Sequence, residues 1–264
     1  MSYYPLLRAP GCGGVTTLYN FAPNNWEERE KRERFANLSW SDGKQWQSRK
    51  LATLAYGATL CVRIADVAGM VPDHALPLLS LSDVPLPAEA DKLPAAGMPH
   101  TSYPNWRATL GLLAEGGAST CYQGEVDPFP APGSMLTFGH FLQTGAEVEN
   151  YLLLVNLEAS PHTREARLEV RDAAQPGRLL TSARVWNNQV NIVKLDWAGM
   201  NETQLPLLVC MGMSGIPLYF SRTADGRYLS LEHTHPPASS VVHGRRWDAQ
   251  KLLKQLWFSK VSGA

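Results

Sequence analysis

The chain has 264 residues, with 24 basic and 24 acidic side chains and no formal net charge. This balance provides no domain-scale basic face to release phosphate counterions, so we expect no nucleic-acid partner. The first residues lack a basic region followed by an apolar one, and no apolar run reaches the about 18 residues of a membrane span. We therefore expect a soluble, cytoplasmic protein without a membrane partner.

The four cysteines, Cys12, Cys61, Cys121 and Cys210, are widely spaced and include no CxxC pair. Four cysteines in a chain of this length do not form a disulfide framework. We therefore expect reduced thiols. Cys121 and Cys210 fall within apolar strand-like runs, where a buried and unreactive thiol is the expected state.

Residues 26–35 include eight consecutive charged side chains. Opposite charges recur four residues apart, as in the pair Glu27 and Lys31. This spacing predicts a short, exposed, charged helix near the N-terminus. We interpret these charged side chains as a solvated surface of the helix, and the alternative is a helix that docks a partner.

Seven prolines lie between Pro72 and Pro104. Each proline removes a backbone donor and fixes φ, so we expect no central strand there and interpret the segment as an extended crossing. The chain is accordingly divided into an N-terminal region of residues 1–105, packed on the main body, and a body of residues 106–264.

The body shows the pattern of short antiparallel strands. In residues 165–171 apolar side chains alternate with charged ones, which is typical of a half-buried strand. Asn187 with Asn188, and Asp225 with Gly226, favour tight hairpin turns. We predict an antiparallel β-sandwich or a flattened barrel. Further strands are predicted at 107–113, 134–142, 150–157, 178–186, 190–195, 206–211, 216–222 and 227–235.

Near the C-terminus the spacing of apolar residues changes from every second residue to every third or fourth, which predicts an amphipathic helix. Its apolar residues recur at i, i+3, i+4, i+7 and i+8, the spacing of one helix face. We expect this stripe to pack on the body, with a membrane-surface or partner helix as the alternative. The stripe consists of Ala249, Leu252, Leu253, Leu256 and Trp257.

Three of the seven histidines lie within eleven residues: His233, His235 and His243. Alternation along a strand places Leu229, Leu231, His233 and His235 on one face, where they continue an apolar stripe. We expect the two histidines at the end of the inner face, beside a pocket at the mouth of the β structure.

A metal site is a second use of these side chains. His140, in the predicted strand 134–142, also points inward by alternation. Neutral imidazoles bind zinc, iron or nickel, so His233, His235 and His140 are the candidate ligands of a divalent metal, with His243 as a further contributor. Partly buried, hydrogen-bonded histidines without a ligand are the plain alternative.

Two of the eight tryptophans are candidates for stacking on a sugar. Trp186 stands beside the predicted turn, and Trp106 stands beside Tyr103 and Asn105. Loops present side chains outward, and a tryptophan face stacks on the C–H surface of a saccharide. Burial in the core is the plain alternative for any tryptophan.

The leading hypothesis is a protein that binds a glycan or another polar small molecule in a pocket lined by histidines and aromatic residues. The ligand-binding candidates are His233, His235, His243, Trp186 and Trp106. A metal-dependent enzyme and a structural or assembly subunit are the alternatives. No complete catalytic motif is present, so the sequence decides neither whether the protein is an enzyme nor its oligomeric state.

Overall fold

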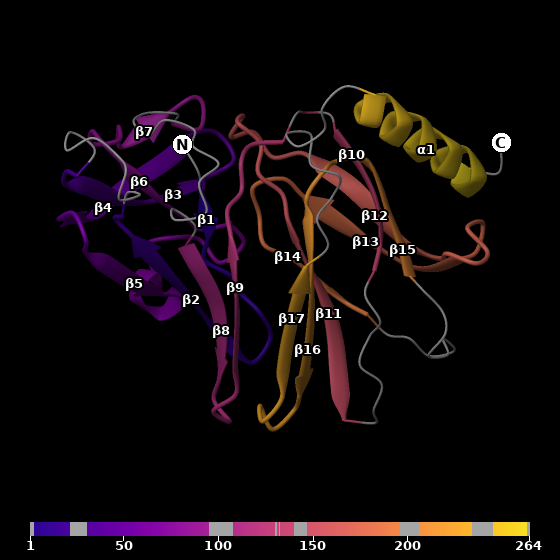
Figure 1. The fold of residues 1–264 in the computed structure, drawn as a ribbon, viewed down its shortest axis with the longest axis horizontal. Helices are drawn as coiled ribbons and strands as arrows, with labels where there is room; N and C mark the ends of the chain where they lie inside the picture. The colour runs from indigo at the N-terminus through magenta and orange to yellow at the C-terminus, as the bar shows by residue number, and fades with distance from the viewer. Residues whose placement is uncertain are drawn as a thin grey trace.

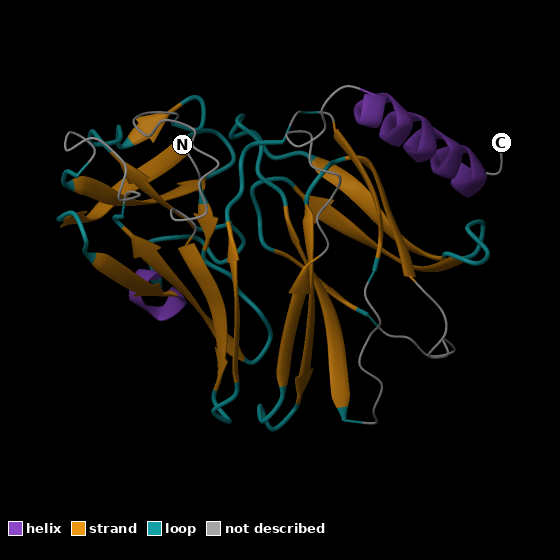
Figure 2. Ribbon diagram, in the orientation of Figure 1, coloured by secondary structure: helices purple, strands orange, loops and turns teal. Residues whose placement is uncertain are grey.

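The computed structural model describes residues 3–21, 31–94, 108–129, 131, 133–139, 147–195, 206–233 and 245–262 (Figures 1 and 2). Strands dominate these ranges, neighbouring strands within each sheet are antiparallel, and one α-helix, α1 (Arg245–Ser262), lies near the C-terminus. The predicted mainly β class and the C-terminal helix are confirmed. Within the same ranges, no helix is long and apolar enough to cross a membrane.

The predicted strands beyond residue 106 each overlap an observed strand, and the strand-like run expected around Cys121 is β9 (Ser119–Gly124), for which no bounds were predicted. A short 3-10 helix, η2 (Ile64–Val67), follows β5. The strands are β1 (Tyr4–Pro5), β2 (Cys12–Tyr19), β3 (Arg34–Ser41), β4 (Trp46–Leu54), β5 (Thr59–Arg63), β6 (Leu78–Ser82), β7 (Glu89–Ala90), β8 (Ala108–Ala114), β9 (Ser119–Gly124), β10 (Gly133–Phe138), β11 (Val148–Val155), β12 (Glu165–Asp172), β13 (Leu179–Trp186), β14 (Asn191–Lys194), β15 (Pro206–Gly212), β16 (Ile216–Thr223) and β17 (Leu229–His233).

Hydrogen bonding divides the described strands into four sheets. The first sheet has the order β1-β6-β3-β4-β7 and the second has the order β5-β2-β8-β9. The third sheet has the order β14-β11-β16-β17 and the fourth has the order β10-β15-β12-β13. The four sheets are arranged as the blades of a propeller-like ring and do not clearly form the β-sandwich or flattened barrel predicted from the sequence.

The proline-rich segment contains a strand that the prediction excluded. β6 lies between β1 and β3 in the first sheet. The segment can pair on both sides because Pro77 immediately precedes the strand and no proline falls within it. The second sheet takes β2 and β5 from early in the chain and β8 and β9 from residues 108–124. Strand pairing therefore crosses residue 106, and the division into regions stays a prediction.

Buried apolar side chains form separate clusters between the sheets. One cluster lies between the first and second sheets, and another lies between the third and fourth. The cluster that we call the central cluster draws on the first, second and third sheets, with Trp46, Leu112 and Phe220 among its members. The N-terminal strands are thus packed on the later ones by apolar burial, which is the dominant favourable term in folding.

The charged segment before β3 differs from the prediction. Arg34 opens this strand, and its side chain is only 1% exposed. Its guanidinium donates from Nε to Asp83 at 3.1 Å and from Nη1 to Asn20 at 2.8 Å. The helix predicted for residues 26–35 therefore does not reach Arg34, while residues 26–30 lie outside the described residues. The charge pattern alone did not reveal that Arg34 has buried partners.

The helix α1 packs on the fourth sheet with only part of the predicted stripe, since Trp257 is packed and two of the predicted leucines are not. Val261 is buried, and Trp257 and Phe258 are partly buried against β15. Leu252 and Leu256, which the apolar stripe predicted to be packed, are exposed. The larger aromatic side chains bury more apolar area than the leucines, which accounts for the choice of face.

The predicted hairpin at Asn187 and Asn188 is a connection between sheets. Asn188 has φ of 57°, the positive value that the prediction requires. The flanking strands do not pair, because β13 belongs to the fourth sheet and β14 to the third. The Asn191 side chain fixes the corner by accepting from the backbone N–H of Trp186 at 2.8 Å.

Candidate functional site

His233 lies at the end of β17, the edge strand of the third sheet. It pairs with Leu218 on β16, and Leu231 pairs with Phe220. Directly opposed residues share a face of the sheet, so His233 lies on the face of the central cluster, which contains Leu218, Leu231 and Phe220. The facing assignment predicted for this strand is confirmed up to His233.

The strand β9 lies alongside β17, although the two belong to different sheets (Figure 1). Their hairpin tips touch, with the N–H of Ala118 donating to the carbonyl of Gly226 at 3.3 Å. Gly116 permits this approach, because a Cβ atom there would stand 2.1 Å from the carbonyl oxygen of Asp225. We call the contact between β9 and β17 the seam.

Tyr122 and His233 face each other across the seam. Their ring centroids are 5.2 Å apart and their planes are inclined by 38°. Gly124 makes room for the tyrosine, because a Cβ atom at this residue would stand 2.4 Å from Cε2 of Tyr122. Both rings are half-buried, so each packs on the protein with one part and reaches solvent with another.

Tyr122 supplies a desolvated hydroxyl group to the seam. Burial raises its pKa well above the ordinary tyrosine value, and no charge on the described residues contributes to the shift. Within the part of the chain that the structure describes, no hydrogen bond to the Tyr122 hydroxyl is present. A half-buried hydroxyl in this state gains free energy from a ligand that accepts or donates a hydrogen bond.

Of the other candidate residues from the sequence, Trp186 alone lies within the described residues. His235, His243, His140 and Trp106 lie outside the described residues. Trp186 ends β13 in the fourth sheet, so it belongs to a different sheet from His233. The described residues contain no group of three or more His, Cys, Asp or Glu side chains placed to hold a metal ion. The divalent metal site stays a prediction.

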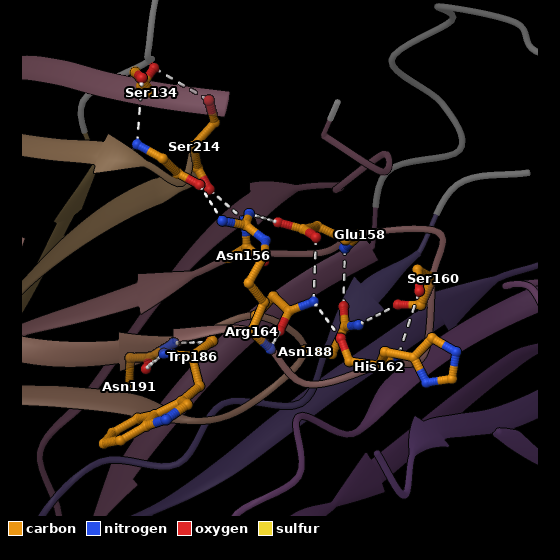
Figure 3. A network of polar contacts seen from close by, with 12 residues as sticks. Ser134, Asn156, Glu158, Ser160, His162, Arg164, Trp186, Asn188, Asn191 and Ser214 are labelled. Atoms are coloured by element: carbon orange, nitrogen blue, oxygen red, sulfur yellow. Dashed lines mark hydrogen bonds and ion pairs between the residues drawn. The ribbon is translucent and has the colours of Figure 1, made fainter. Parts of the chain in front are cut away.

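A second polar cluster surrounds the buried carboxylate of Glu158 (Figure 3). Arg164 donates from Nη2 to this carboxylate, and Asn187 donates to it from Nδ2 at 3.2 Å. Asn188 accepts from the Glu158 backbone N–H at 2.8 Å and donates to the Ser160 carbonyl at 2.8 Å. These bonds hold two loops together, residues 156–164 and 187–190, so we assign the cluster a structural role.

Sequence reasoning missed Tyr122 and the cluster around Glu158. The facing of Tyr122 could have been predicted, because alternation in residues 119–124 places its side chain on one face of a strand with Thr120 and Gly124. Its pairing with His233 across two sheets has no local signal. For Glu158 the local sequence gives no such indication, because residues 156–162 mix polar and apolar side chains.

The seam offers an aromatic face, an imidazole and a phenol hydroxyl, which together can stack on a ligand and hydrogen-bond to it. No protein family, curated protein or solved structure matches the chain. Any functional assignment therefore depends on the geometry of the seam itself.

Proposed function

We propose that the protein binds a neutral, hydroxyl-bearing small molecule at the seam, with saccharides as the first class of ligand. The single observation that supports this proposal is the half-buried ring pair of Tyr122 and His233. An aromatic face stacks on the C–H surface of a sugar ring, while a hydroxyl and an imidazole provide directional hydrogen bonds.

The neutral character of the ligand follows from the surroundings of Tyr122. Burial is the cause of the raised pKa of Tyr122, and no charged side chain of the described residues contributes to it. A charged ligand would lose hydration there without meeting an opposite charge, which costs free energy. A neutral polyol loses less on desolvation, and its hydroxyl groups can pair with the Tyr122 hydroxyl, which has no hydrogen-bond partner among the described residues.

His235 and His243, which follow β17 in the sequence, remain candidate contacts to the same ligand, and Trp106 and Trp186 remain candidate stacking residues. The metal-dependent enzyme and the assembly subunit also stay predictions, as do the cytoplasmic location and the absence of a nucleic-acid partner.

Glycan-array screening followed by calorimetry tests the proposal. The wild type is compared with Tyr122→Phe, which removes only the hydroxyl, and with His233→Ala. We expect a neutral saccharide to bind the wild type, Tyr122→Phe to weaken binding by about 1 kcal/mol, or roughly fivefold, and His233→Ala to weaken it further.

Tyr19→Phe is the matched control. Tyr19 lies in the second sheet, as Tyr122 does, is half-buried, and its hydroxyl is already hydrogen-bonded to Thr109 at 2.9 Å. Its substitution should leave saccharide binding unchanged. Absence of binding to every saccharide on the array, or equal effects of Tyr19→Phe and Tyr122→Phe, would refute the proposed site.

A further inference from the structure

The helix α1 presents a second apolar face to solvent. Leu252 and Leu256 are 58% and 52% exposed and lie one helical turn apart. Around the helix axis they stand about 140–180° from Val261, the buried residue that contacts the fourth sheet. The exposed leucines therefore lie on the side opposite the packed face, where Figure 1 shows no other described element.

The packed side of α1 carries the aromatic contacts. Phe138, at the end of β10, is 38% exposed and packs edge-on against Trp257 with ring centroids 5.4 Å apart. The ammonium group of Lys260 lies 5.1 Å from the Trp257 ring centroid, a cation–π contact. Lys260 follows Leu256 by about one helical turn, so an exposed basic residue stands beside the exposed leucines, and basic and apolar side chains together are typical of helices that lie in a membrane interface.

Charge distinguishes among the partners that could cover the leucines. Residues 245–262 contain five basic side chains and one acidic side chain, whereas the whole chain has no net charge. A second copy of the chain would bring two basic helices together, which is unfavourable. An anionic surface would instead be attracted, with each basic residue near the membrane adding to the binding free energy.

We propose that the face defined by Leu252 and Leu256 binds the surface of an anionic lipid bilayer, with α1 lying parallel to the membrane plane. A bilayer interface accepts a convex helix without a complementary groove, so the two leucines can enter it while basic side chains meet the anionic headgroups. This weak, reversible attachment is independent of ligand binding at the seam and replaces the sequence-based expectation of no membrane partner.

Vesicle co-sedimentation of the full chain tests the proposal. One vesicle preparation contains phosphatidylglycerol in phosphatidylcholine, and the other contains phosphatidylcholine alone. We expect sedimentation with the anionic vesicles at low salt, loss of sedimentation at high salt, and little with the neutral vesicles. The double variant Leu252→Ser, Leu256→Ser should reduce partitioning by a factor of about ten or more.

Ile192→Ser is the matched control, because Ile192 is a 40% exposed apolar residue on β14. It should sediment as the wild type does, and circular dichroism should show the same β-rich spectrum for all three proteins. No sedimentation with anionic vesicles, or equal sedimentation of the double variant, overturns the proposal. A dimer in light scattering that the double variant dissociates would overturn it in favour of a second copy.

Discussion

The guanidinium of Arg222 lies against the backbone of Gly11, so that a Cβ atom at residue 11 would stand 1.8 Å from Nη1. The same guanidinium donates from Nε and Nη2 to Glu149, at 3.1 and 2.8 Å. Gly11 directly precedes β2 of the second sheet, whereas Arg222 and Glu149 belong to the third. The contact joins the same two sheets that Tyr122 and His233 join at the seam.

Gly11→Ala should lower the free energy of unfolding by more than Gly57→Ala. Both glycines have positive φ, +65° and +82°, where an L side chain costs about 1–2 kcal/mol. Only at residue 11 would the new Cβ meet another atom, since nothing lies within 4 Å at residue 57. Urea denaturation measures both losses. Equal losses would show that Arg222 moves aside without cost.

Glu149→Gln should destabilise the protein at neutral pH and have less effect in acid. Hydrogen bonds from Lys194, then Arg222 and Tyr151, lower the pKa of Glu149 from 4.5 to about 2. A carboxylate whose folded pKa is depressed contributes stability that is fully present above 4.5 and is lost as the pH falls toward about 2. Denaturation at a series of pH values should show the two proteins converging over this interval. A constant difference would contradict the ion-pair account.

Glu158→Ala should cost about 2–4 kcal/mol, because it leaves Arg164 and Asn187 without their buried acceptor. The control is Glu165→Ala, since the Glu165 carboxylate is 48% exposed and lies 3.6 Å from Arg184. Removal of an exposed ion pair should change stability by about 0–1 kcal/mol. Thermal denaturation compares the two variants, and similar losses would argue against a structural role for the cluster.

The four thiols should react with a thiol reagent at very different rates. Cys61 and Cys121 are exposed, whereas Cys210 is buried and burial raises its pKa to about 11. We expect the two exposed cysteines to be alkylated in the folded protein and Cys210 only after unfolding. Peptide mass mapping after timed alkylation measures this order. Alkylation of Cys210 as fast as Cys61 would contradict its placement in the core.

Local sequence patterns predicted the strands well, because alternation reports which side chains one sheet buries. The stripe of Leu229, Leu231 and His233 is on one face as predicted. The turn at Asp225 and Gly226 is also confirmed, with φ of +67° at the glycine and the Thr223 N–H bonded to the Tyr228 carbonyl. Each of these features is set by neighbours in the chain.

Alternation does not report which sheet a strand joins. Asn188 has the positive φ that a hairpin needs, yet the strands on either side belong to different sheets. Cys121 falls in a strand, as the sequence suggests, but lies on the exposed face instead of the buried one. The same limit conceals the pairing of Tyr122 with His233, because it depends on how the second and third sheets meet.

The packed face of α1 was predicted only in part. The predicted stripe joined Leu252 and Leu256 to Trp257, but of these three only Trp257 packs on the fourth sheet. Phe258 and Val261, which the stripe left out, pack beside it. Periodicity does not indicate how much area each side chain buries, and the larger aromatic side chains favour the face that is observed.

The most direct test of the functional account is NMR of protein with isotope-labelled tyrosine and histidine rings, titrated with panels of neutral and anionic saccharides. The account predicts that a neutral saccharide shifts the ring signals of Tyr122 and His233 together, with one saturation curve, and leaves those of Tyr19 unchanged. If every saccharide leaves the Tyr122 and His233 signals unmoved, or moves them no more than those of Tyr19, the seam is not the binding site.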